Sequence, residues 1–255
     1  MLVIRSEQMR LLGLAELEVF KQDLARHLAG FAPELFALRG ESVFRAVVDQ
    51  GVSRAARYGF THRGPLRFFV ECMVAYGVEF DTDVQIQGLQ DVLVRSHANG
   101  QQWHADQAFA AVRRYQIQTR GRDNAYAIEA LRRLGAYLAW LDSLPDAGLE
   151  AELLQLMASI HPEKFGFVGP ALLGRLITQA RQEAARHGIE QPSGVGLLCG
   201  LMFALGHGIT RDPLYPWVND SLAQPPARDA AWRIESLRRK TRLYLTAVLD
   251  RLPAH

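Results

Sequence analysis

The chain has 255 residues, of which 49% are hydrophobic and 22% charged, and its 29 Lys and Arg residues exceed its 27 Asp and Glu residues by two. This composition is typical of soluble globular proteins and argues against extensive disorder, while the near balance of charges argues against general nucleic-acid binding. The sequence contains no apolar stretch of the roughly 18 residues that a membrane span needs, and no signal-peptide pattern opens it. We therefore expect a cytoplasmic protein that binds neither membranes nor nucleic acids.

The chain matches itself without gaps when it is shifted by 129 residues. The segment APELFALRG from Ala32 falls on HPEKFGFVG from His161, and AARYG ending at Gly59 falls on AARHG ending at Gly188. Further matched positions pair Asp83 with Asp212, Trp103 with Trp232 and Tyr115 with Tyr244. The match predicts a tandem duplication of a unit of about 100 residues.

Each copy is expected to be helical, because its apolar residues recur at three- and four-residue steps. In the first copy a helix over residues 43–55 ends near Gly59, and a short apolar helix runs from Pro65 to Gly77. A polar loop, a short helix and a long helix follow. The long helices carry Trp103 and Trp232, which we expect in the core. The pattern predicts an all-α fold.

Between the copies, residues 123–144 predict a connecting helix that ends at Pro145. Its apolar face is too extensive for a bare linker, so we expect it to pack against one or both copies. The predicted organisation is a first helical repeat over residues 1–120, a connecting helix over 121–147 and a second helical repeat over 148–255.

No strong catalytic signature is present: the sequence lacks a phosphate-binding GxxxxGK[ST] loop, an HExxH zinc pair and a GxSxG elbow. Gly194, Gly196 and Gly200 follow a helix end rather than a strand, so they predict close helix packing instead of a dinucleotide site. Cys72 and Cys199 lie in apolar runs and are expected to be buried free thiols. We expect no catalytic residues, no bound metal and no cofactor.

The two polar loops are the strongest candidates for a functional site. The first reads GVEFDTDVQIQG and contains Glu79, Asp81 and Asp83, whereas the second, GHGITRDPLYPW, keeps only Asp212 of these carboxylates. Alternating carboxylates can bind a hard cation. Alternatively, Asp83 and Asp212 form caps or Asx turns between helices. A third reading is that the loops bind a partner, because Tyr215 and Trp217 are typical interface anchors.

The opening VIRSEQM, the AARYG helix end and the GVEFDTD loop resemble small helical proteins of bacterial type VI secretion gene clusters. Their pattern is VIRxEQM, then YGI, then GxxFDxDPxxPW. The first loop here has Val84 and Gly88 at the Pro and Trp positions, and the second has Ile209 and Thr210 in place of Phe-Asp. The resemblance implies an accessory protein that works by binding other proteins.

The sequence thus predicts a non-enzymatic, chaperone-like or immunity-like adaptor that binds an effector, a toxin or a spike component. Six residues are the predicted partner-binding set: Phe80, Asp81, Asp83, Asp212, Tyr215 and Trp217. The alternative is a helical metal-dependent enzyme that uses Glu79, Asp81 and Asp83 with His207 or Asp212.

Overall fold

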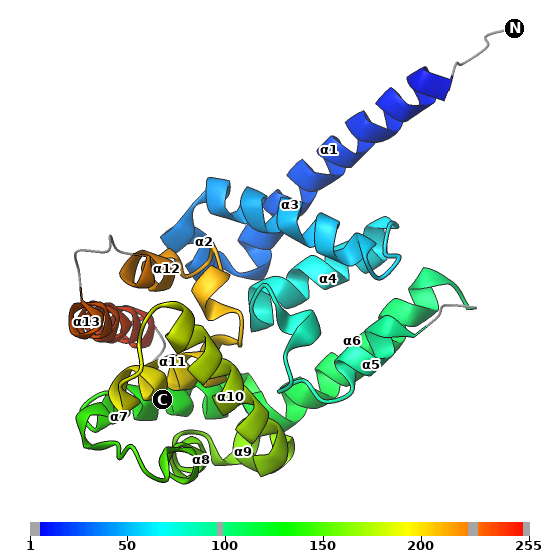
Figure 1. The fold of residues 1–255 in the computed structure, drawn as a ribbon. Helices are drawn as coiled ribbons and strands as arrows, with labels where there is room; N and C mark the ends of the chain where they lie inside the picture. Colours follow the sequence, from blue (N-terminus) through cyan, green and yellow to red (C-terminus); the bar gives the residue numbers. More distant parts are fainter. Residues whose placement is uncertain (1–5, 96–98, 224–228, 252–255) are drawn as a thin grey trace, which may run out of the picture.

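A computed structural model describes residues 6–95, 99–223 and 229–251, and within these residues the fold is all-α. They form thirteen α-helices and four short 3₁₀ helices, with no strand (Figure 1). The predicted all-α class is therefore confirmed.

The elements of the first half match those of the second in order, and most begin at positions 129 residues apart. The first half contains α1 (Ser6–Phe31), α2 (Pro33–Arg39), α3 (Glu41–Ala56), α4 (Arg63–Tyr76), η1 (Phe80–Thr82), α5 (Leu89–Val94) and α6 (Gly100–Arg120). The second half contains α8 (Leu149–Ile160), α9 (Pro162–Val168), α10 (Pro170–Arg186), α11 (Pro192–Leu205), η4 (Ile209–Arg211), α12 (Pro216–Leu222) and α13 (Ala230–Leu249). Three elements lie between them: η2 (Arg122–Asn124), α7 (Ala125–Tyr137) and η3 (Leu141–Ser143).

Glycines end the helices where the sequence predicts it. Gly59 and Gly188 follow α3 and α10 with φ angles of 73° and 63°, in the left-handed region that glycine tolerates best. Three residues separate α4 from η1 and α11 from η4, and the first of them are Gly77 and Gly206, whose φ angles are 98° and 106°. These two glycines bring the chain into the loops that carry the predicted site.

Helix α11 lies at the centre of the second half, with ten of its residues buried. A Cβ on Gly196 would lie 2.4 Å from a Leu144 methyl carbon, and one on Gly200 would lie 3.1 Å from a Leu134 methyl carbon. A Cβ on Gly194 would lie 2.3 Å from Ile189. The three glycines thus allow close packing, as the sequence predicts, and Cys72 and Cys199 are buried free thiols.

The segment between the halves packs against both of them, as predicted. Helix α7 contacts α6 of the first half and α8, α11 and α13 of the second. The predicted connecting helix is shorter than expected, because α7 ends at Tyr137 and the chain continues through a turn into η3 before Pro145. Buried side chains of both halves form one continuous core cluster.

Helix α1 packs against α2, α3 and α4, and its N-terminal part extends away from the other helices (Figure 1). Among the described residues, no helix is both long enough and apolar enough to cross a membrane.

Candidate functional site

The loops that follow α4 and α11 meet each other at the junction of the two halves. A Cβ on Gly206 would lie only 2.5 Å from the carbonyl oxygen of Tyr76, and one on Gly77 would lie 3.1 Å from that of Leu205. Glycine at both positions therefore permits a backbone approach that a side chain would prevent.

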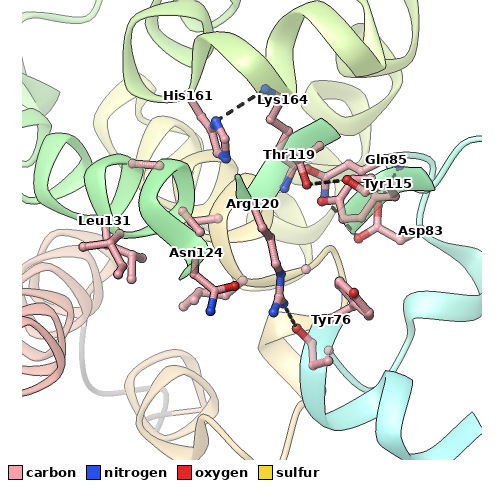
Figure 2. Close-up of a pocket in the computed structure, with 18 of the residues that line it drawn as sticks. Tyr76, Asp83, Gln85, Tyr115, Thr119, Arg120, Asn124, Leu131, His161 and Lys164 are labelled. Carbon is pink, nitrogen blue, oxygen red and sulfur yellow. Dashed lines mark hydrogen bonds between the residues drawn. The ribbon is translucent and has the colours of Figure 1, made fainter. Parts of the chain in front are cut away.

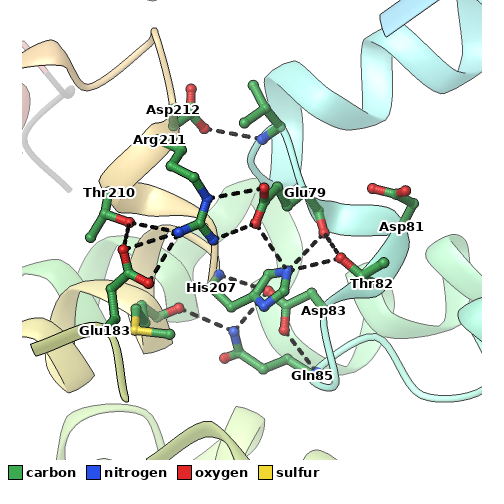
Figure 3. Close-up of polar contacts among 12 residues, drawn as sticks. Glu79, Asp81, Thr82, Asp83, Gln85, Glu183, His207, Thr210, Arg211 and Asp212 are labelled. Atoms are coloured by element: carbon green, nitrogen blue, oxygen red, sulfur yellow. Dashed lines mark hydrogen bonds and ion pairs between the residues drawn. The ribbon is translucent and has the colours of Figure 1, made fainter. Parts of the chain in front are cut away.

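Asp83 and Asp212 make matching hydrogen bonds across this junction (Figure 3). The backbone N–H of His207 donates to Asp83 Oδ2 at 3.0 Å, and the N–H of Val78 donates to Asp212 Oδ2 at 3.0 Å. Val78 and His207 are 129 residues apart, as are the two aspartates. Each half thus supplies a carboxylate that satisfies a buried N–H group of the other.

The second oxygen of each aspartate forms the local turn that the sequence predicts. Asp83 Oδ1 accepts from the N–H of Gln85 at 2.9 Å, and Asp212 Oδ1 accepts from the N–H of Leu214 at 2.8 Å. These are Asx turns. Burial raises the pKa of the Asp212 carboxyl to about 6, although its two backbone hydrogen bonds favour the charged form.

A network of ion pairs extends the junction outward (Figure 3). Arg211 of the second half donates to Glu79 Oε2 at 2.9 Å and to both carboxylate oxygens of Glu183 at 3.0 Å. Burial opposes ionisation of both carboxyls, but the hydrogen bonds and the charge of Arg211 hold their pKa values below the usual range. His207 Nε2 lies 3.0 Å from the carbonyl oxygen of Glu79 and 3.1 Å from Thr82 Oγ1.

Asp81 lies within the first half and is bound by α3. Arg54 Nη2 donates to Asp81 Oδ1 at 2.6 Å, and the Tyr58 hydroxyl donates to Oδ2 at 2.8 Å. In the second half, Glu183 stands at the position of Arg54 and Thr210 at the position of Asp81. The Thr210 hydroxyl donates to Glu183 Oε1 at 2.7 Å. The link between these positions is therefore present in both halves, with the acidic residue on the opposite element.

Five of the six residues predicted to bind a partner are buried in this region. Phe80, Asp81, Asp83 and Asp212 are each 5% exposed or less, and Tyr215 is 9% exposed. Trp217 is half-buried, with its ring 5.6 Å from that of Tyr244. An approaching protein therefore does not meet most of these side chains in this structure, and their contacts are internal.

The residues of the predicted metal-dependent enzyme also gather here, but they are bonded to cations and to backbone N–H groups. Asp81 binds Arg54, Glu79 binds Arg211, and Asp212 accepts two N–H groups. Within the described ranges, no group of three or more His, Cys, Asp or Glu side chains is arranged to hold a metal ion.

A pocket of about 270 Å³ lies beside the junction, between the two halves and α7 (Figure 2). Its walls include Tyr76 and Tyr115 of the first half, Lys164 and Tyr244 of the second, and Ile128 of α7. Asp83 also lines it, so the aspartate that joins the halves forms part of its wall.

The pocket carries a buried amine. Lys164 is 5% exposed, and its Nζ donates to the carbonyl oxygen of Phe203 and lies 4.7 Å from the centroid of the Phe203 ring. Desolvation lowers the pKa of Lys164 to about 8, although the negative charge of Asp83 acts to raise it. It also lowers the pKa of His161 to about 4, so this imidazole is neutral at pH 7.

Sequence reasoning missed this pocket, although one signal was available. In the self-alignment Lys164 falls on Leu35, so a cation occupies a position where the other half has an apolar residue. A charge at a position that is apolar in the other copy is a reason to expect a polar site.

Large apolar side chains lie exposed on α5 and α6. Val94 is 66% exposed, Trp103 47%, Phe109 53% and Ile117 58%. We call these four residues the α6 surface. The expectation that Trp103 lies in the core is wrong, because the buried face of α6 runs through Ala105, Ala108 and other residues offset from the tryptophan.

Comparisons with protein-family models, with curated proteins and with solved structures found no match to this chain.

Proposed function

We propose that this protein is a non-enzymatic accessory protein that binds a protein partner through the α6 surface. The observation that carries the proposal is the exposure of Trp103, Phe109 and Ile117 on one helix, together with that of Val94 on α5, a helix that packs against α6. Exposed large apolar side chains that cluster on a surface are typical of protein-binding sites, and Trp is among the most frequent interface hot spots.

The surroundings of these side chains also suit an interface. Arg113 and Arg114 are exposed on the same helix, between Phe109 and Ile117. Arginine is enriched at interfaces along with aromatic residues. A partner with an apolar patch and acidic residues at its edge would complement this helix.

The resemblance to proteins of type VI secretion clusters supports a partner of a particular kind: an effector, a toxin or a spike component. An adaptor would carry such a partner, and an immunity protein would block it. Both would act in the cytoplasm, where we place the protein. The proposal needs no cofactor.

We further infer that the two halves descend from one duplicated unit. The offset of 129 residues between element starts supports this inference, as do the paired hydrogen bonds of Asp83 and Asp212. Under this origin the polar loops are the contact between the halves, and the α6 surface is left for a partner.

Affinity capture from the source bacterium tests the proposal. We expect the wild-type protein to retain a stoichiometric partner, and the triple variant Trp103→Ser, Phe109→Ser, Ile117→Ser to lose it, because hot-spot truncations cost about 2 kcal/mol or more each. The matched control is Trp140→Ser with Leu243→Ser, which removes apolar groups 68% and 61% exposed on other elements.

Both variants should keep the helical circular dichroism of the wild type and a single cooperative melting transition, although Phe109 packs against Phe68 and its loss lowers the melting temperature. Equal recovery of the partner by the triple variant and the control would contradict the proposed surface. Recovery of no partner by the wild type would contradict the proposed function itself.

A further inference from the structure

The pocket beside the junction is built from matching positions of the two halves. Tyr76, Tyr115 and Thr119 line it from the first half, and the residues 129 positions later, Leu205, Tyr244 and Val248, line it from the second. The pocket therefore lies where the two halves face each other, and a fully symmetric pair of halves would give it two similar walls.

Three polar residues break this symmetry, because the matching positions of the other half hold apolar residues. Arg120, His161 and Lys164 line the pocket (Figure 2). The positions that match them in the other half hold Leu249, Ala32 and Leu35. The positive charge of the pocket thus comes from Arg120 and Lys164, and neither residue has a charged counterpart in the other half.

These positive charges have no carboxylate partner among the described residues. No Asp or Glu oxygen lies within 4.0 Å of Lys164 Nζ or of the Arg120 guanidinium in that part of the chain, where each group donates to a carbonyl oxygen, of Phe203 and Ala75 respectively. An ammonium group has three donors, so Lys164 can still donate to a ligand. Lys164 also lies over the Phe203 ring and Arg120 over the Tyr76 ring, but neither forms an ion pair within the described residues. Because burying a charge without an ion pair is costly, the pocket favours an anionic ligand.

The single carboxylate in the pocket wall is already used. Asp83 accepts from the backbone N–H groups of His207 and Gln85 and from Gln85 Nε2. It therefore tempers the positive charge of the pocket without forming an ion pair with Lys164.

The part of the pocket wall that α7 and α13 form is apolar. Ile128 and Leu131 of α7 and Val248 of α13 contribute aliphatic side chains. The volume of about 270 Å³ is below the range of about 300–1,000 Å³ that is typical of sites for drug-sized ligands. These walls suit a short aliphatic or small aromatic group.

We propose that this pocket binds a small amphipathic carboxylate, with the charge of the ligand toward Lys164 and Arg120 and its apolar part against Ile128 and Leu131. This site is separate from the α6 surface, so the two proposals stand independently. Because the pKa of Lys164 is about 8, the amine is largely charged at pH 7 and can attract the carboxylate.

Three probes of equal chain length test the ligand class: octanoate, 1-octanol and octylammonium. We expect octanoate to bind at pH 7 at least tenfold more tightly than octanol, and octylammonium not to bind, as measured by isothermal titration calorimetry. Methyl NMR should place octanoate near Ile128 and Val248. Absence of octanoate binding, or equal binding of the three probes, would overturn the proposal without requiring any variant.

A matched pair of lysine variants tests the site. Lys164→Met keeps the aliphatic stem and removes the charge, so the preference for octanoate over octanol should disappear. Lys240→Met removes the same charge from a partly buried position on α13 that does not line the pocket, and it should leave the preference unchanged. Tenfold preference retained in a folded Lys164→Met protein would overturn the assigned site, as would octanoate-induced shifts confined to methyl groups outside the pocket.

Discussion

At the scale of single residues, the junction depends on two carboxylates that each accept two backbone N–H groups. Asp83 and Asp212 use one oxygen for a local Asx turn and the other for an N–H of the opposite half. A carboxylate can do this because both of its oxygens are acceptors, whereas an amide has only one.

Replacing either aspartate by asparagine should therefore destabilise the fold. Asp83→Asn or Asp212→Asn leaves one buried N–H group without an acceptor, and we expect a loss of about 1–3 kcal/mol from the free energy of unfolding. Urea denaturation measures it. Asp106→Asn, on the exposed face of α6, is the control and should change stability by less than about 0.5 kcal/mol. Equal effects at buried and exposed positions would contradict the assignment.

The pKa of Asp212 gives a prediction with a defined sign. The folded value of about 6 lies above the ordinary value of 3.8, so the folded state binds the proton more tightly. Its contribution to stability therefore increases as the pH falls from above 6 toward 3.8. Since Asp212→Asn cannot titrate, we expect the variant to lose more stability relative to the wild type at pH 4.5 than at pH 7.5. Urea denaturation at pH 4.5 and pH 7.5 measures this difference. A loss of stability in Asp212→Asn that is equal or smaller at pH 4.5 would contradict the prediction.

The sequence predicts the local Asx turns of the two aspartates but not their hydrogen bonds across the junction. An Asp in a polar loop between two helices indicates an Asx turn, and both turns are confirmed. The bonds to Val78 and His207 depend on how two segments 129 residues apart pack together, and a local pattern carries no information about that. For the same reason, the burial of five of the six candidate residues could not be predicted from their polar or aromatic side chains.

At the scale of elements, helices α4 and α11 end where their following loops come into contact. Gly206 has a φ of 106°, and a Cβ there would lie 2.5 Å from the carbonyl oxygen of Tyr76. The neighbouring atom belongs to the backbone, so a side-chain rotation cannot relieve the contact.

Gly206→Ala should therefore cost about 3 kcal/mol or more, through backbone strain and the lost approach of the halves. Two other glycines separate these causes. Gly40 has a φ of 77° with nothing within 4 Å of its Cβ position, so Gly40→Ala measures strain alone. Gly166 lies inside α9 with open space around it, so Gly166→Ala should be neutral or stabilising by up to about 1 kcal/mol. If thermal denaturation showed the same loss of stability for Gly206→Ala as for Gly40→Ala, the close contact at Gly206 would be contradicted.

Helical periodicity identified most elements because amphipathic spacing and glycine ends are local signals. It failed for the tryptophan of α6, because a helix with a short buried face of alanines leaves large side chains outside. It also placed the end of the connecting helix too late, since the apolar spacing of α7 continues through the turn into η3, where Leu141 is fully buried.

At the scale of the whole molecule, the two halves form a single core. Their buried side chains belong to one cluster, α7 contacts both of them, and the bonds of Asp83 and Asp212 cross between them. The polar loops are therefore part of the folded body, and the exposed apolar residues of α6 are a surface on it.

Differential scanning calorimetry of the wild-type protein tests this unity most directly. We predict one transition in which the calorimetric and van't Hoff enthalpies agree, because neither half can unfold without exposing the core of the other. The Asp83→Asn, Asp212→Asn double variant should melt at a lower temperature. Two resolved transitions in the wild type, with the lower-melting step insensitive to both substitutions, would contradict a single core. The polar loops would then be available to bind a partner.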